Sequence, residues 1–226
     1  MAVEVVDLGA VARRLKGPQA LAEVARAGDF AARIVLTQGA VPWHKHVDQD
    51  EMFLVLEGEI SLESEWGKQV LGVGEMAVVS KGVAHRSASS GRSVVLLFER
   101  RIHADRQDGR RKLFVLEGEG ELEKISLEVA VADLGDAPAG KRLVAVDDWV
   151  AQLKIHQGKG RWHRYGHDRL ILVHSGELRL EDASEGQSLA AGQLAAVPAR
   201  WRHRTVSEDD TVAIHFTHKQ ETGEDG

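Results

Sequence analysis

The sequence of 226 residues contains no cysteine. Disulfide bonds, thiol nucleophiles and thiolate metal sites are therefore excluded, and any metal site must use histidine, carboxylate or water ligands. No apolar run approaches the ~18 residues that a transmembrane helix requires. The first ten residues, MAVEVVDLGA, lack the basic and long apolar regions of a secretory signal. We therefore expect a cytoplasmic protein with no membrane partner.

Positive charge is also scarce, because the formal net charge is −6 with histidine neutral. Proteins that bind nucleic acid are more often basic, and no helix-turn-helix pattern is present, so nucleic acid is not the expected partner. Apolar residues make up 43% of the chain and charged residues 28%, which is typical of a globular protein. A small molecule is the expected ligand.

One pattern occurs twice in the chain. The stretch WHKHVDQDEMFLVLEGE at residues 43–59 resembles WHRYGHDRLILVHSGE at residues 162–177, and GEMAVVSKGVAHR at 74–86 resembles GQLAAVPARWRHR at 192–204. His44 and His163 are 119 positions apart, whereas Gly58 and Gly176, like His85 and His203, are 118 apart. Three landmarks in one order at nearly one offset indicate a tandem duplication, whose period is far longer than that of solenoid repeats.

The duplication predicts four segments. We expect a first domain over residues 1–100, a linker or strand over 101–126, a second domain over 127–218 and a polar tail over 219–226. Within both copies, short apolar runs alternate with glycine-containing turns at the spacing of an all-β sandwich or barrel. LGAVARRL at residues 8–15 predicts a short N-terminal helix, and PQALAEVARAG at 18–28 is compatible with a helix or with a hairpin turn.

The repeated motifs resemble those of the cupin superfamily, in particular the broad group of cupin 2 proteins. The first motif of the family corresponds here to Gly39, His44, His46, Glu51 and Gly58. The second corresponds to Gly74, Gly82 and His85, with Ser80 and Ser89 in place of the usual proline and asparagine. The resemblance covers both copies and implies a bicupin. It implies two tandem β-barrels of the double-stranded β-helix, or jelly-roll-like, type.

The first copy has the side chains for a metal site. Residues i and i+2 on a strand face the same way, so His44 and His46 are expected to point into one space, and Glu51 shares a strand face with Phe53. Three imidazoles from His44, His46 and His85 and the Glu51 carboxylate suit one divalent first-row metal (Fe, Mn, Ni, Co or Zn) with two positions left for water or substrate. Trp43 and Phe53 are the expected pocket walls. The competing interpretation is a polar hairpin with surface histidines.

The second copy has lost part of this ligand set. His163 and His203 occupy the positions of the first and last histidines, but Tyr165 and Arg169 replace the second histidine and the glutamate. A guanidinium repels a divalent cation. Three hypotheses remain open: a purely structural barrel, an anion site formed by Arg169, Tyr165 and the histidines, or a three-histidine site that adds His167.

Two classes of function follow from the first copy. One is a metal-dependent enzyme for a small oxygen-rich substrate, either dioxygenase-like or a Lewis-acid isomerase or lyase. The other is a non-catalytic barrel that binds or senses a sugar or metabolite through its metal. Cupin barrels host many reactions, so the fold does not choose between these classes. The apolar run MFLVLEG at residues 52–58 predicts a strand buried on both faces, which favours an intramolecular pseudo-dimer that can associate further into a homodimer.

Overall fold

The structure is a computed structural model that describes residues 3–101, 120–135, 140–220 and 224–225. The chain divides into two compact units. The N-terminal barrel comprises residues 11–24 and 29–129, and the C-terminal barrel comprises residues 1–10, 25–28 and 130–226. Each unit is built on an eight-stranded antiparallel sheet, so the expected all-β fold with two tandem barrels is confirmed.

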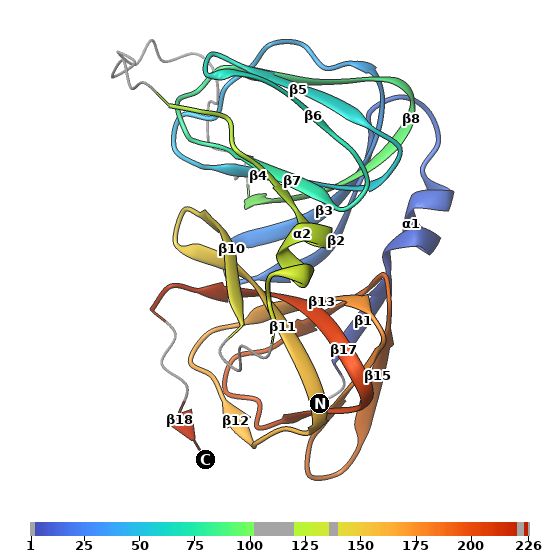
Figure 1. The fold of residues 1–226 in the computed structure, drawn as a ribbon, viewed down its shortest axis with the longest axis vertical. Helices are drawn as coiled ribbons and strands as arrows, with labels where there is room; N and C mark the ends of the chain where they lie inside the picture. Colours follow the sequence, from blue (N-terminus) through green and yellow to red (C-terminus); the bar gives the residue numbers. More distant parts are fainter. Residues whose placement is uncertain (1–2, 102–119, 136–139, 221–223, 226) are drawn as a thin grey trace. The chain divides into compact units, whose positions relative to one another are not determined.

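The sheet of the N-terminal barrel has the strand order β2-β3-β8-β4-β7-β9, and β5 and β6 branch from β8 (Figure 1). These strands are β2 (Ala20–Ala27), β3 (Phe30–Ala40), β4 (Glu51–Glu57), β5 (Ile60–Ser64), β6 (Gly67–Leu71), β7 (Glu75–Val79), β8 (His85–Arg100) and β9 (Lys124–Ser126). Strand β8 is 16 residues long and pairs with β3, β4 and β5, so it belongs to both layers of the barrel.

The C-terminal barrel repeats this arrangement with the order β10-β11-β17-β13-β16-β1, and β14 and β15 branch from β17. Its strands are β1 (Glu4–Asp7), β10 (Lys141–Val146), β11 (Trp149–Lys159), β13 (Arg169–Ser175), β14 (Glu177–Glu181), β15 (Gly186–Ala190), β16 (Gln193–Val197) and β17 (Arg204–His218). The short β12 (His163–Arg164) pairs with β18 (Glu224–Asp225). Two sheets with one strand order confirm the duplication that the motifs predict.

Two short strands are exchanged between the copies. Strand β1 precedes the first copy in sequence but pairs with β16 of the C-terminal barrel, and Figure 1 shows it in blue among orange and red strands. Strand β9 precedes the second copy but pairs with β7 of the N-terminal barrel. Each exchanged strand leads into a helix, α1 (Leu8–Arg14) or α2 (Leu127–Ala132). The division of the chain therefore differs at the edges from the contiguous segments 1–100 and 127–218.

The two ambiguous stretches now have a defined structure. The predicted N-terminal helix is confirmed as α1. The alanine-rich stretch at 18–28 forms β2 and the turn to β3, because pairing with β3 in the sheet overrides its helical propensity. Most of the predicted linker, residues 102–119, lies outside the described residues. Within its last part, Leu122 is buried in the core of the N-terminal barrel.

Strand β4 is the most buried strand of the N-terminal barrel. Every residue from Glu51 to Val55 is buried, which confirms the prediction from its continuous apolar run. One face, Phe53 and Val55, packs into the barrel core with Ile60, Leu62 and Leu71. The corresponding core of the C-terminal barrel contains Ile171, Val173, Leu178, Leu180 and Leu189. The inner face of β4 therefore leads directly from the apolar core to Glu51.

Gly58, which ends β4, provides a test of this packing. Its φ is +76°, and a Cβ there would lie 2.5 Å from Ser93 Oγ and 2.7 Å from the Arg92 carbonyl oxygen. Gly39 has a similar φ of +79°, but a Cβ there would meet nothing within 4 Å. We expect Gly58→Ala to lower the free energy of unfolding by about 2–4 kcal/mol and Gly39→Ala by about 1 kcal/mol, as measured by denaturant titration. Equal losses would show that backbone strain alone, and not crowding, decides the effect.

Candidate metal centre

The first two candidate ligands lie in the loop between β3 and β4. His44 forms an isolated bridge with His85, in which each backbone N–H donates to the carbonyl of the other at 3.0 and 2.9 Å. The carbonyl of His46 accepts a hydrogen bond of 2.6 Å from Gly82 N–H. The expectation of a regular strand through both histidines is wrong, because only this single bridge is present. The bridge and the turn contact nevertheless hold both residues beside the start of β8.

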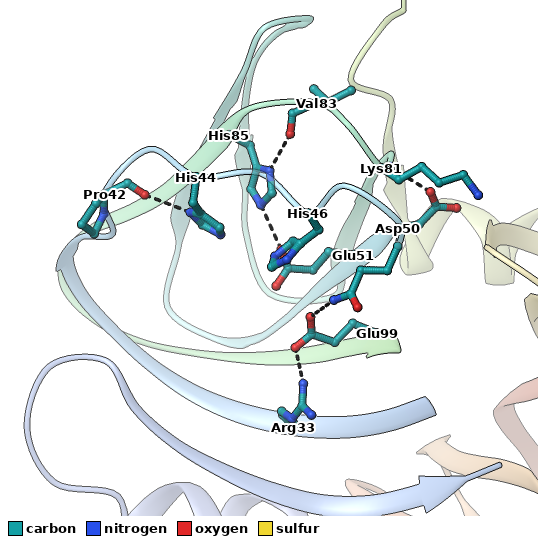
Figure 2. Close-up of polar contacts among 11 residues, drawn as sticks. Arg33, Pro42, His44, His46, Asp50, Glu51, Lys81, Val83, His85 and Glu99 are labelled. Carbon is teal, nitrogen blue, oxygen red and sulfur yellow. Dashed lines mark hydrogen bonds and ion pairs between the residues drawn. The ribbon is translucent and has the colours of Figure 1, made fainter. Parts of the chain in front are cut away.

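The four side chains converge on one point (Figure 2). One ligand atom from each of His44, His46, Glu51 and His85 lies within 4.8 Å of all the others. Glu51 Oε2 lies 3.2 Å from His46 Nε2 and 2.9 Å from His85 Nε2. Glu51 and His85 are buried, and the other two are half-buried. Among the described residues, this is the group of histidine and carboxylate side chains that has the spacing of a metal site.

Backbone carbonyls orient two of the imidazoles. His44 Nδ1 lies 2.9 Å from the Pro42 carbonyl oxygen, and His85 Nδ1 lies 3.0 Å from that of Val83. Since a carbonyl can only accept, each Nδ1 donates to its carbonyl, which turns each Nε2 towards the centre. This outer contact is the usual way in which a protein fixes the tautomer of a metal-binding histidine. The donor set therefore fits a divalent cation.

The charge states also suit a cation. Burial alone would raise the pKa of Glu51, but hydrogen bonds from His46 and His85 outweigh it and lower that pKa to about 2. Burial lowers the pKa of His44 below 6.5, although the Pro42 carbonyl partly opposes this. At neutral pH the centre therefore presents an ionised carboxylate together with a neutral His44.

A cavity of about 370 Å³ opens beside the cluster, which is large enough for a small organic molecule. It is walled mainly by apolar side chains from β2, β3, β4 and β8, with a few polar groups; its lining comprises Gln19, Leu21, Val35, Thr37, Val41, Pro42, His44, His46, Glu51, Phe53, Ser87, Val95, Leu97 and Glu99. Phe53 is thus a wall, as expected. Trp43 is not, because it is 50% exposed and its ring lies 5.3 Å from the guanidinium of Arg86.

A second carboxylate in the cavity, Glu99, belongs to neither sequence motif. Glu99 on β8 is opposite Glu51 on β4 and is buried. Arg33 pairs with it, and Gln49 Nε2 donates to its Oε2 at 2.8 Å (Figure 2). Burial and the nearby Glu51 raise the pKa of Glu99. One sequence signal could have found it: Glu99 continues the inward parity of Val95 and Leu97 at the end of an apolar run.

The C-terminal barrel has the same backbone geometry with different side chains. His163 and His203 form the matching isolated bridge, with backbone hydrogen bonds of 2.7 and 3.0 Å. Arg169 begins β13 opposite Val197, just as Glu51 begins β4 opposite Val79. Arg169 is buried, and its guanidinium carbon lies 3.1 Å from the ring centroid of Tyr165. These four residues therefore occupy the positions of the N-terminal cluster.

The three-histidine alternative does not form. His167 is exposed and stacks on His218 at 4.4 Å between ring centroids, and it belongs to no ligand cluster in the described part of the chain. The shorter loop turns its side chain away from the barrel interior. Two acids of this barrel have other partners: Asp168 accepts from the N–H groups of Gly28 and Ala199, and Glu181 pairs with Arg204 and Arg179.

Two further histidines, to which the sequence assigns no role, meet inside this barrel. His156 Nε2 and His215 Nε2 are 2.9 Å apart, and His215 is 3% exposed. Burial lowers the pKa of His156 to about 4 and that of His215 well below 6.5, and nearby Lys154 lowers both further. Burial likewise lowers the pKa of His203 to about 4. The interior of this barrel therefore opposes positive charge on its imidazoles.

These shifts predict that acid weakens the folded state. The unfolded chain binds protons on these histidines below pH ~6.5, whereas the folded chain binds them on His156 and His203 only near pH ~4 and on His215 only well below pH ~6.5. Stability is therefore fully present above pH ~6.5 and is lost as the pH falls towards 4. We expect His215→Leu, which introduces the residue found at the matching position 97, to reduce the loss between pH ~7 and pH ~5 by about 1–2 kcal/mol in urea titrations. An unchanged pH dependence in this variant would contradict the assignment.

Comparisons with known proteins agree with this geometry. The cupin domain family matches residues 33–99. The uncharacterized protein YdbB of Bacillus subtilis (strain 168) is 33% identical over 94 residues, which cover 41% of this chain and 83% of that protein.

Two solved structures share the whole fold. A cupin 2 conserved barrel domain protein from Leptotrichia buccalis has a TM-score of 0.73 at 11% identity, with coverage of 97% of this chain and 98% of that one. A salicylate 1,2-dioxygenase from Pseudaminobacter salicylatoxidans has a TM-score of 0.78 at 11% identity, with coverage of 99% and 87%. With the motifs, the matching barrels and these similarities, the chain belongs to the cupin superfamily, in its cupin 2 group, as a bicupin.

Proposed function

We propose that the N-terminal barrel is a metal-dependent active site for a small, largely apolar molecule that carries oxygen ligands. The observation that carries this proposal is the position of the cluster, which forms part of the wall of the 370 Å³ cavity. A metal held there would face the bound molecule. When bound, a divalent first-row metal supplies a Lewis acid, or, as Fe(II), an O₂-binding centre.

The candidate ligands make different contributions to metal binding, either a fixed donor direction or a negative charge. His44 and His85 offer Nε2 atoms whose direction is fixed by hydrogen bonds to backbone carbonyls. Glu51 offers a carboxylate that is ionised at neutral pH and offsets part of the metal charge. His46, which lies in the same loop as His44, is the fourth candidate ligand. Three imidazoles and one carboxylate leave coordination positions open on a six-coordinate ion.

The cavity walls favour a flat or compact apolar body with a polar end. Phe53, Val95 and Leu97 exclude water from one side, which strengthens electrostatic interactions inside. Thr37 and Ser87 place hydroxyl groups in the lining, where they can orient substrate oxygens. Such a lining is better suited to an enolisable or hydroxylated ring acid than to a sugar, which needs more hydrogen-bonding groups.

The similarity in fold to a salicylate 1,2-dioxygenase supports oxygen-dependent chemistry on such a molecule. Lewis-acid isomerisation or lyase chemistry uses the same ligand set and is the second form of the proposal. A barrel that binds the molecule without turnover is the remaining alternative. The two experiments below separate binding of the metal from reaction of the substrate.

Metal content is the first test of this proposal. We expect close to one divalent metal per chain in protein purified without chelator, measured by elemental analysis. His85→Ala removes one of four ligands and should lower metal affinity about tenfold or more. The matched control is His203→Ala, because His203 occupies the same backbone position in the C-terminal barrel. Two tightly held metals per chain, or equal loss in both variants, would contradict the assignment.

The second prediction concerns turnover. Protein loaded with Fe(II) should consume O₂ in the presence of hydroxybenzoates or enolisable acids, and Glu51→Gln should abolish uptake while His203→Ala retains it. Product formation under nitrogen with Zn(II) or Mn(II), followed by NMR, would instead indicate isomerase or lyase chemistry. Saturable binding without product under every metal and gas condition would overturn the enzyme proposal in favour of a binding protein.

A further inference from the structure

The two barrels place opposite charges at matching interior positions. Strand register makes the correspondence explicit, because Arg33 pairs with Leu97 as Gln152 pairs with His215, and Val35 pairs with Val95 as Lys154 pairs with Ala213. In the same way, Ala31 pairs with Glu99 as Val150 pairs with Thr217.

The N-terminal interior thus holds two carboxylates, Glu51 and Glu99, against one guanidinium, Arg33. At the matching positions the C-terminal interior has Arg169, Thr217 and Gln152. Lys154 adds an ammonium group where the other barrel has Val35. Both carboxylates and the guanidinium of Arg33 are therefore lost at these positions, and two cations, Arg169 and Lys154, are gained. The N-terminal interior is suited to a cation, and the C-terminal interior to an anion.

These groups share a cavity of about 210 Å³. It is lined by side chains of β11, β13 and β17 and of their flanking loops, namely Val150, Gln152, Lys154, Tyr165, Arg169, Thr217, His218 and Lys219. Among these described lining residues none is acidic, whereas three carry a positive charge and four others can donate or share a hydrogen bond. A buried guanidinium with amide and hydroxyl donors around one small space is the usual composition of an oxyanion site.

The two cations also lower the pKa values of neighbouring imidazoles. Arg169 contributes to lowering the pKa of His203, and Lys154 contributes to lowering that of His156. Both cations therefore act on the barrel interior and not on solvent alone.

We infer that the C-terminal barrel binds one small oxyanion, a carboxylate or a phosphate, in the cavity between Arg169 and Lys154. Arg169 holds it through its planar pair of N–H groups, and Lys154 supplies a second charge from β11. The inference is independent of the metal centre, since the two cavities share no residue. The chain then has two pockets of opposite charge preference on one backbone plan.

Calorimetry with malonate and with inorganic phosphate tests this site, at constant ionic strength in sodium chloride. The full-length protein is titrated as purified and again after its metal has been removed by chelator. We expect one anion per chain in both forms, with malonate and phosphate distinguishing carboxylate from phosphate recognition. Binding only to the metal-containing form would place the anion on the metal and overturn the inference.

Three variants locate the bound anion. Arg169→Gln should weaken binding about tenfold or more, because it removes a charge-assisted pair of hydrogen bonds. Lys154→Val, which introduces the residue of the other barrel, should weaken binding several-fold, and it decides the matter if Arg169→Gln does not fold. Arg179→Gln is the control, because the side chain of Arg179 is exposed and lies outside the cavity. No binding to the wild type, or equal affinity in all variants, would overturn the inference.

Discussion

A pair of backbone hydrogen bonds between the first-motif loop and the start of the long strand is the constraint on which both sites depend. It joins His44 to His85 in one barrel and His163 to His203 in the other. Because it uses only main-chain atoms, it can form whichever side chains occupy these positions. The loop also stays beside the first residue of β4 or β13. The same geometry can therefore present a glutamate to a cation or an arginine to an anion.

The interior charge then decides what each barrel can hold. In the N-terminal barrel, Glu51 is kept ionised by two imidazoles, while Arg33 and Gln49 fix Glu99 behind it. In the C-terminal barrel, three imidazoles are kept neutral by burial and by nearby cations. A few substitutions at inward-facing positions thus reverse the preference of a cavity, whereas the core residues that hold the strands remain aliphatic. Stability and ligand choice are separated along one strand, because Glu51 or Arg169 is its first residue and the core residues follow on the same face.

Much of this arrangement could be predicted from the sequence. The spacing from glutamate or arginine to the turn glycine placed Glu51 and Arg169 correctly, because strand parity is fixed once the glycine ends the strand. Three features were not predicted. Glu99 ends an apolar run, where a charge normally indicates the surface. Trp43 adjoins a ligand, yet its side chain points outward. The sequence did not show which strands pair with residues 4–7 and 124–126, because strands this short carry no pattern that specifies one sheet edge over another.

The exchanged strands also set the order in which the protein can be completed during synthesis. Strand β1 is synthesised before the rest of the first copy, yet its partner β16 is synthesised only after most of the second copy. The N-terminal barrel, for its part, lacks β9 until the chain has been made past residue 126. Neither barrel can close its sheet as a nascent domain from its own copy alone. Folding therefore finishes late, through contacts of very high sequence separation, and these are the slowest contacts for a chain to find.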